Sequence, residues 1–277
     1  MPEPLNYLIT GAARGIGRGL TRHILSQNHR VFLIDSNLPE LTNTTAHLQK
    51  LGFSTPENFK TSHTDLSDRP AIASAVSSAA DYFSGRVDVL INNAFPTPHI
   101  WSNSASMGSS EVDIMAEWDR KVAVGLTAPF LLSRLCIPFL TFPVENRKAS
   151  PGTIIHISST RAHQSETNHE AYSAVKAGLI GLTQSMSVSL GETHKIRVNA
   201  ISPGWIHVED ENEAGDAEGR KWENGLTEQD HQWHSAGRVG KVEDIAKAVE
   251  FLVTSDFVTG TEIVVDGGVS KKMVYPE

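Results

Sequence analysis

The chain has 277 residues, of which 39% are apolar and 20% charged, and a formal net charge of −8. This composition is typical of a globular enzyme and excludes a disordered chain. The net negative charge argues against a nucleic-acid partner, because binding to phosphate backbones requires a basic surface.

The N-terminal sequence MPEPLNYLIT has no basic segment followed by an apolar one, so no secretory signal is expected. The longest apolar stretch, residues 126–142, is interrupted by Arg134 and two prolines, which argues against a membrane span. The single cysteine, Cys136, excludes an intrachain disulfide and fits a reducing compartment. These features favour a soluble, cytoplasmic protein.

The first elements in the chain form a repeating pattern. An apolar strand is predicted at residues 7–9, a helix at 19–27 and a second strand at 31–35. Strand, helix and strand within about 30 residues form a βαβ unit, which requires parallel strands. The alternation then continues to the end of the chain, with strands expected at 87–92, 153–158, 196–201 and 261–265 and helices expected at 71–83 and 242–253.

This alternation predicts an α/β fold: a single doubly wound, Rossmann-like parallel sheet with helices on both faces. We expect one nucleotide-binding domain over residues 1–277. The segment 207–235 is rich in acidic residues, Gly and Asn, and it directly follows a strand end, where ligands bind in such sheets. It is interpreted as a flap over a pocket, with a solvated loop as the alternative.

A glycine-rich loop lies between the first strand and the first helix. Gly11, Gly15 and Gly17 have the spacing Gly-x3-Gly-x-Gly and would let the backbone approach a pyrophosphate at a helix N-terminus. An acidic residue, Asp35, ends the second strand 18 positions after Gly17. Together these features predict a dinucleotide site.

Two residues in this region favour different cofactors. The Asp35 carboxylate can accept hydrogen bonds from the ribose hydroxyls of NAD and would repel the 2′-phosphate of NADP. Arg14, in the glycine loop, could pair with that phosphate instead. NAD is favoured over NADP, because a phosphate dianion beside an unneutralised carboxylate costs more than a distal Arg recovers.

Six motifs in order along the chain, with a seventh near the C-terminus, resemble the short-chain dehydrogenase/reductase (SDR) family. The resemblance covers residue 5 to about Gly268. It is carried by TGAARGIG from Thr10, Asp65-Leu66, Asn92-Asn93-Ala94, Ser159, the Tyr172-x3-Lys176 pair, Asn199-Ala-Ile-Ser-Pro203-Gly204 and Val265-Asp266-Gly267-Gly268. It implies a NAD(P)-dependent oxidoreductase that interconverts a ketone or aldehyde and an alcohol by hydride transfer.

The predicted catalytic residues are Ser159, Tyr172 and Lys176. Tyr172 and Lys176 are four residues apart, so on a helix they share one face. A phenol has a pKa of about 10 and is about 0.1% ionised at pH 7, so a nearby ammonium would favour the phenolate that acts as acid/base. By resemblance, Ser159 orients the substrate oxygen and Lys176 also binds the nicotinamide ribose.

The resemblance assigns the cofactor to a larger set of positions. Asp65 would contact the adenine edge, Asn92 and Ala94 would border the cofactor, and Ile206 would offer its backbone to the carboxamide. The full expected set is Gly11, Arg14, Gly15, Ile16, Gly17, Asp35, Asp65, Leu66, Asn92, Ala94, Tyr172, Lys176, Pro203, Gly204 and Ile206.

The chain departs from the family pattern at three positions. Gly125 stands where many members have a catalytic Asn that helps to hold a proton-relaying water, so this relay is in doubt. Val208 replaces a frequent Thr that contacts the carboxamide. Phe95 replaces a Gly after Asn-Asn-Ala and is interpreted either as packing against the cofactor or as an apolar wall of the substrate pocket.

The substrate is expected to be a small carbonyl or alcohol compound. Expected pocket residues are Phe95, Arg161, His163 and Trp205, with Gln164, Trp222 and Trp233 as further candidates. No metal is expected, because His231 and His234 have no evident third ligand. Reduction of a C=N or C=C bond, or an NAD-binding regulatory protein without turnover, remain alternative functions. The resemblance also implies a homotetramer or homodimer formed through helices around 115–140 and 171–190.

Overall fold

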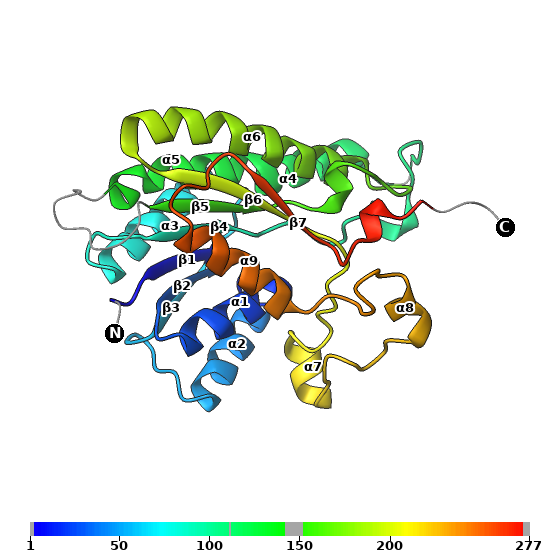
Figure 1. The fold of residues 1–277 in the computed structure, drawn as a ribbon, viewed down its shortest axis with the longest axis horizontal. Helices are drawn as coiled ribbons and strands as arrows, with labels where there is room; N and C mark the ends of the chain where they lie inside the picture. The colour runs from blue at the N-terminus through cyan, green and yellow to red at the C-terminus, as the bar shows by residue number, and fades with distance from the viewer. Residues whose placement is uncertain (1–2, 111, 142–151, 274–277) are drawn as a thin grey trace.

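The computed structural model describes residues 3–110, 112–141 and 152–273. Seven parallel strands form one twisted sheet in the order β3-β2-β1-β4-β5-β6-β7 (Figure 1). The strands are β1 (Asn6–Thr10), β2 (Arg30–Asp35), β3 (Phe59–His63), β4 (Val89–Asn92), β5 (Thr153–Ile157), β6 (Arg197–Pro203) and β7 (Glu262–Val265). The predicted doubly wound parallel sheet is therefore confirmed.

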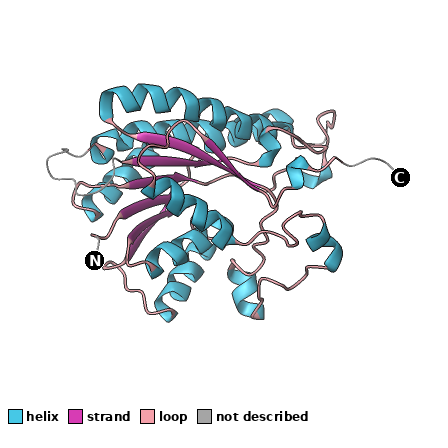
Figure 2. Ribbon diagram, in the orientation of Figure 1, coloured by secondary structure: helices cyan, strands magenta, loops and turns pink. Residues whose placement is uncertain are grey.

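Helices cover both faces of the sheet (Figure 2). One face packs against α1, α2 and α9, and the other against α3, α5 and α6. The bounds are α1 (Gly15–Ser26), α2 (Leu38–Lys50), α3 (Arg69–Tyr82), α4 (Ile114–Val122), α5 (Ala128–Leu140), α6 (Glu170–His194), α7 (Glu213–Glu218), α8 (Glu228–Gln232) and α9 (Val242–Thr254).

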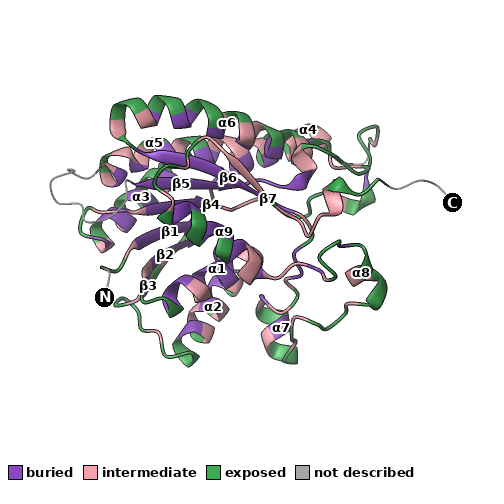
Figure 3. Ribbon diagram, viewed as in Figure 1, coloured by how far each residue is buried: buried purple, intermediate pink, exposed green. Residues whose placement is uncertain are grey.

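The central strands β1, β4, β5 and β6 are buried along their whole length because helices cover both faces of the sheet (Figure 3). In β1, Tyr7 and Ile9 point into the core beneath α1 and α9, whereas Leu8 points into the core beneath α3 and α5. Successive side chains of β1 therefore point to opposite faces of the sheet and contribute to both apolar cores. Leu8 and Ile9 have no exposed surface.

The six strands expected from the sequence are all present, but β3 was not predicted. Its sequence, FKTSH, is mostly polar, and of its five residues only Phe59 is fully buried. β3 lies at the edge of the sheet and pairs only with β2. An edge strand needs no continuous apolar run, so hydrophobic periodicity does not reveal it.

A continuous helical stretch from Ile114 to Leu140 joins α4 and α5 through a π-helical turn, Ala123–Thr127. By length and composition it could cross a membrane. Its apolar side chains nevertheless pack into the protein core, where Leu132, Cys136 and Leu140 are fully buried against the sheet. This packing is that of the core helix of a globular α/β protein.

The segment 207–235 contains two short helices, α7 and α8, and lies beside the glycine loop end of the sheet (Figure 1). An ion-pair network ties α7 to the fold. The buried Arg18 guanidinium donates to both carboxylate oxygens of Asp216 at 2.8 Å. Asn43 of α2 also donates to Asp216, at 2.6 Å. Polar contacts thus hold α7 against α1 and α2, and Val208, at the start of the segment, packs against the apolar core.

Candidate active site

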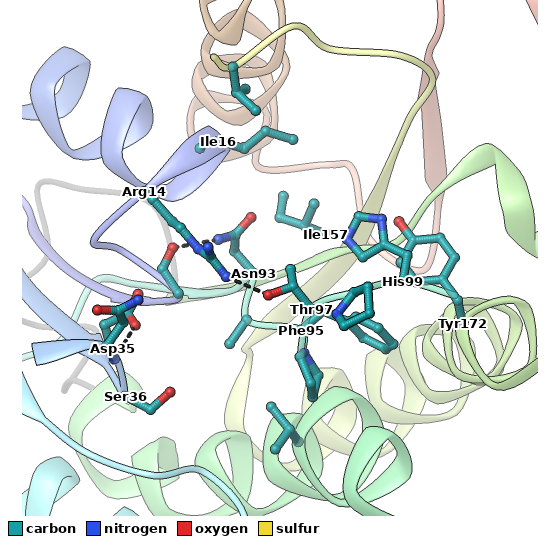
Figure 4. Close-up of a pocket in the computed structure, with 18 of the residues that line it drawn as sticks. Arg14, Ile16, Asp35, Ser36, Asn93, Phe95, Thr97, His99, Ile157 and Tyr172 are labelled. Carbon is teal, nitrogen blue, oxygen red and sulfur yellow. Dashed lines mark hydrogen bonds between the residues drawn. The ribbon is translucent and has the colours of Figure 1, made fainter. Parts of the chain in front are cut away.

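A cavity of about 1310 Å³ lies at the carboxyl ends of the strands. Its walls come from the residues that follow β1, β2, β4, β5 and β6. The strand order reverses between β1 and β4, and ligands of doubly wound sheets bind at such a switch point. The cavity extends from Asp35 at one end to Tyr172 at the other, and Figure 4 shows this arrangement.

The glycine loop is packed too tightly for side chains. A Cβ atom at Gly11, whose φ is +63°, would lie 2.8 Å from the Cα of Ala94. A Cβ atom at Gly17 would lie 2.0 Å from the carbonyl oxygen of Gly11. The loop therefore brings bare backbone to the cavity at the start of α1, a helix with no acidic residue in its first turn. This is a cradle suited to an anion.

The Asp35 carboxylate is fixed by backbone amides at the end of β2. Oδ2 accepts a hydrogen bond from the Ala13 amide at 3.0 Å, and Oδ1 accepts one from the Asn37 amide at 2.9 Å. Each oxygen keeps a second lone pair for a further donor. The carboxylate therefore presents a fixed acceptor site to the cavity.

Arg14 does not point toward Asp35. Its Nη2 donates to Thr97 Oγ1 at 2.6 Å, on the opposite side of the cavity (Figure 4). The guanidinium thus connects the glycine loop to the loop that follows β4. In this arrangement the region around Asp35 keeps its negative charge uncompensated by Arg14.

The three predicted catalytic residues converge at the other end of the cavity. Ser159 follows β5 and accepts a hydrogen bond from the Arg161 amide at 3.1 Å. Tyr172 and Lys176 lie one turn apart near the start of α6. The buried Lys176 ammonium donates to the Ile157 carbonyl at 2.7 Å, and its burial lowers its pKa to about 7.

The electrostatic environment of Tyr172 differs from the expectation. Burial raises the pKa of Tyr172, and a hydrogen bond with Ser159 and the charge of Arg161 act in the opposite direction. The sequence predicted that the Lys176 ammonium would favour the phenolate. In the structure the protein surroundings favour the neutral phenol, because desolvation outweighs the neighbouring charges.

Tyr172 is surrounded by aromatic rings that the sequence motifs did not reveal as a group. The His99 imidazole stacks on the Tyr172 ring, with centroids 4.5 Å apart, and Phe95 meets it edge-on at 4.9 Å (Figure 4). Burial and the nearby charge of Lys176 lower the pKa of His99 to about 4, so His99 is neutral at pH 7. His99 lies in a loop without a motif, so no sequence signal points to it.

Most of the other predicted cofactor and substrate residues also line the cavity. These are Gly11, Arg14, Gly15, Ile16, Asp35, Asp65, Leu66, Ala94, Phe95, Arg161, Pro203, Gly204, Trp205 and Ile206. Residues that the sequence did not single out, including Ser36, Thr97 and His169, also border it.

Several candidates lie elsewhere. Asn92 is buried beneath the cavity, where its amide faces His156 Nδ1 at 3.2 Å, and Gly17 lies behind Gly11. His163 contacts Glu262 at 2.9 Å outside the cavity. Gln164, Trp222 and Trp233 are also not among the lining residues. Within residues 3–110, 112–141 and 152–273, no three His, Cys, Asp or Glu side chains are grouped as metal ligands.

The fold and the site define a class of protein, an α/β protein with a doubly wound parallel sheet and a cavity at its switch point. The family model described as Enoyl-(Acyl carrier protein) reductase matches residues 11–270. An uncharacterized oxidoreductase of Thermotoga maritima is 34% identical over 273 residues, covering 98% of this chain and 97% of that protein.

Two solved structures extend the comparison. An apo SCOR enzyme from Clostridium thermocellum superposes with a TM-score of 0.78 at 34% identity, covering 99% of this chain and 96% of that one. A 3-oxoacyl-[acyl-carrier protein] reductase from Brucella melitensis, solved with NAD, has a TM-score of 0.74 at 28% identity, with coverage of 96% and 91%. The chain belongs to the short-chain dehydrogenase/reductase family and is an oxidoreductase.

Proposed function

We propose that the protein is an NAD-dependent oxidoreductase that interconverts a small ketone or aldehyde and the corresponding alcohol, with Tyr172 as the acid/base. One observation carries the proposal. Ser159, Tyr172 and Lys176 border the same cavity as the glycine loop and Asp35. The cavity volume of about 1310 Å³ exceeds the roughly 300–1,000 Å³ of common small-molecule sites, which leaves room for a dinucleotide and a substrate together.

The cavity residues fit a dinucleotide. The bare backbone at Gly11 and Ile16 would hold the pyrophosphate beside Gly15, whose own amide donates to the Glu211 carbonyl. Asp35 would accept hydrogen bonds from the adenosine ribose. The free lone pairs of Asp35, and the pairing of Arg14 with Thr97, support NAD over NADP. When bound, the nicotinamide supplies or accepts the hydride. The NAD in the related Brucella melitensis structure is consistent with this assignment.

The protein residues handle the proton. In reduction, Tyr172 would donate its phenolic proton to the carbonyl oxygen of the substrate, while Ser159 donates a hydrogen bond to the same oxygen. In oxidation the proton would return to Tyr172. The Lys176 ammonium is held at Ile157 and would stabilise negative charge on the phenol during the transfer.

The substrate would lie against an aromatic and partly basic wall. Phe95 and Trp205 offer apolar surface, and Arg161 offers a charge near Tyr172. This wall suits an apolar or aromatic carbonyl compound that also carries a polar or anionic group. His163 lies outside the cavity and takes no part in this proposal.

The proposal also covers location and assembly. We infer a soluble, cytoplasmic protein that forms a homodimer or homotetramer and acts without nucleic-acid, membrane or metal partners. The acidic net charge, the single cysteine and the packing of the apolar helix into the core support this inference.

The test follows oxidation of NADH and NADPH against a panel of ketones, aldehydes and enoyl thioesters. We expect turnover of carbonyl compounds with NADH to fall by a factor of about 10² to 10⁴ in Tyr172→Phe, the typical contribution of a positioned acid/base. Nucleotide affinity, measured by fluorescence titration, should stay unchanged in the variant. Turnover of enoyl thioesters alone, or full activity of the variant, would contradict the proposal.

A further inference from the structure

Gly125 lies in the π-helical turn Ala123–Thr127, and the structure leaves no space for a side chain there. A Cβ atom built on Gly125 would lie 2.6 Å from Val175 Cγ1 of α6. It would also lie 2.9 Å from Cδ2 and 3.0 Å from Cε2 of the Phe95 ring. Contacts below 3.0 Å require a neighbour to move, and Val175 is buried. The Phe95 ring and Val175 therefore occupy the volume of a residue-125 side chain.

The Phe95 ring also contacts the acid/base pair. It meets the Tyr172 ring nearly perpendicularly, at 88° and 4.9 Å, which is a favourable edge-to-face geometry. The Lys176 ammonium lies 5.5 Å from the centroid of the Phe95 ring, within the range of a cation–π contact. One apolar ring thus joins the Gly125 backbone, the phenol and the ammonium.

We propose that Phe95 is a positioning residue for Tyr172 and Lys176, and that Gly125 is required because its missing side chain makes room for the Phe95 ring. The inference rests on the proposed function, since it concerns the acid/base pair of that site. Where many family members have a polar side chain at the position of Gly125, this protein has the apolar Phe95 ring, which forms a wall beside Tyr172 and Lys176. Placing Asn at position 125 alone would therefore damage the site.

The wall has an electrostatic consequence. It shields the pair from water on the side of the π-helical turn, so desolvation controls the ionisation of Tyr172. Opening the wall would let water solvate the phenolate. With the wall intact, Tyr172 would exchange its proton through the cavity, where Ser159 lies.

The first experiment tests the packing and does not depend on turnover. Replacing a helical Gly by Ala normally stabilises a helix. We expect Gly125→Ala to lower Tm by roughly 5 °C through overpacking. Gly181→Ala is the matched control: Gly181 lies in α6 with no atom within 4 Å of a new Cβ, so its Tm should not fall.

A double-mutant cycle measures how much of the Tm loss caused by Gly125→Ala comes from the contact with Phe95. We expect Gly125→Ala to lower Tm less in a Phe95→Gly background than in wild type, because the clash with the ring is removed while the 2.6 Å clash with Val175 Cγ1 remains. Equal Tm losses in both backgrounds would overturn the packing half of the proposal. So would a Gly125→Asn variant with wild-type Tm and wild-type turnover.

The second experiment tests positioning. Ionisation of Tyr172 is followed by the ultraviolet absorbance of phenolate, with the Tyr172→Phe variant subtracted. Burial raises the pKa of Tyr172, so Phe95→Ala, which opens the wall, should lower the ionisation midpoint by at least about 0.5 pH units. Phe95→Leu keeps the bulk and should shift it less.

The reduction rate and its pH dependence provide a second test of positioning. The reduction rate of Phe95→Ala should fall by about tenfold, the change that 1.4 kcal/mol of lost transition-state stabilisation produces. Its decline with rising pH should begin at a lower pH than in wild type. A purely structural role would leave the ionisation midpoint and the pH profile unchanged, and that result would overturn the proposal. If wild-type protein has no turnover, the proposed function fails, while the Tm cycle and the Tyr172 midpoint still decide this inference.

Discussion

At the scale of single residues, burial dominates the chemistry of the site. Tyr172 and Lys176 lie on one helix face, as their spacing requires; Lys176 is buried and Tyr172 is half-buried. Burial raises the pKa of Tyr172 and lowers that of Lys176 to about 7. Both shifts favour the neutral forms. Charged ligands and water in the cavity would therefore shift the balance between the neutral and ionised forms of Tyr172 and Lys176.

The pKa of Lys176 predicts how stability changes with pH. Its folded pKa of about 7 lies below the unfolded value of 10.5, so between these values the unfolded chain binds more protons. The free energy of unfolding should therefore rise from pH 7 to 9, and the cost of burying Lys176 should be complete below pH 7. Lys176→Met should reduce this rise. Urea denaturation of both proteins over pH 6–9 measures it, and parallel curves would contradict the prediction.

Asp35 should control the choice of nucleotide. Asp35→Ser removes the charge that opposes a 2′-phosphate, so the ratio of kcat/KM for NADH to that for NADPH should fall by a factor of about 10 to 100, equivalent to about 1.4–2.8 kcal/mol. Steady-state rates with both nucleotides provide the measurement. Thr97→Val, which releases Arg14 from its hydrogen bond, is the companion variant. An unchanged ratio in Asp35→Ser would show that the carboxylate does not select the cofactor.

At the scale of elements, ion pairs and backbone hydrogen bonds connect the segment 207–235 to the rest of the fold. The Arg18 side chain is 1% exposed and finds its charge partner in Asp216 of α7. The carbonyl of Glu211 accepts a hydrogen bond from the Gly15 amide at 2.7 Å, so the segment also reaches the glycine loop. The segment is thereby linked to the loop that, in the proposed function, binds the pyrophosphate.

Removal of the Asp216 carboxylate should weaken the attachment of the segment 207–235 to α1. Asp216→Ala leaves the buried Arg18 without its closest partner and should destabilise the protein by about 1–3 kcal/mol, below the largest values for buried pairs because Asp216 is partly exposed. Cleavage within 207–235 during limited proteolysis should become faster. Glu218→Ala, on the same helix and in an exposed pair with Arg220, is the control and should change little. Equal behaviour of the two variants would contradict the anchoring role.

At the scale of the whole molecule, α5 and α6 leave apolar side chains on the surface. Phe130 is 51% exposed and Val188 is 59% exposed, on the helices expected to form the subunit contacts. In the proposed homodimer or homotetramer, a subunit contact through these helices would remove both side chains from water.

Sedimentation velocity should therefore show a species larger than the 30.2 kDa monomer. The double variant Phe130→Glu and Val188→Glu should shift the protein toward a smaller species, because burying two carboxylates in an apolar interface is costly. Lys50→Glu, on α2, adds charge away from these helices and should leave the assembly unchanged. A monomeric wild-type protein would refute the assembly proposal.

The sequence determined the architecture because parallel sheets bury both faces. The strands beginning at Asn6, Arg30 and Val89 each contain an uninterrupted run of three or four apolar residues, which is a local property of the chain. The glycine loop, Asp35 and the pair at Tyr172 and Lys176 were likewise readable, since each depends on spacing within one element or turn. β3 was missed because a polar edge strand has no such local signature.

The tertiary structure alone decided how these parts meet. The stacking of His99 on Tyr172, the direction of Arg14 toward Thr97 and the position of Asn92 beneath the cavity depend on distant segments. The same holds for Gly125, where a side chain would meet Val175 and the Phe95 ring, two residues far from it in the sequence. Side-chain packing, burial and the pKa shifts that burial produces arise from contacts between elements. Such contacts have no periodicity along the chain.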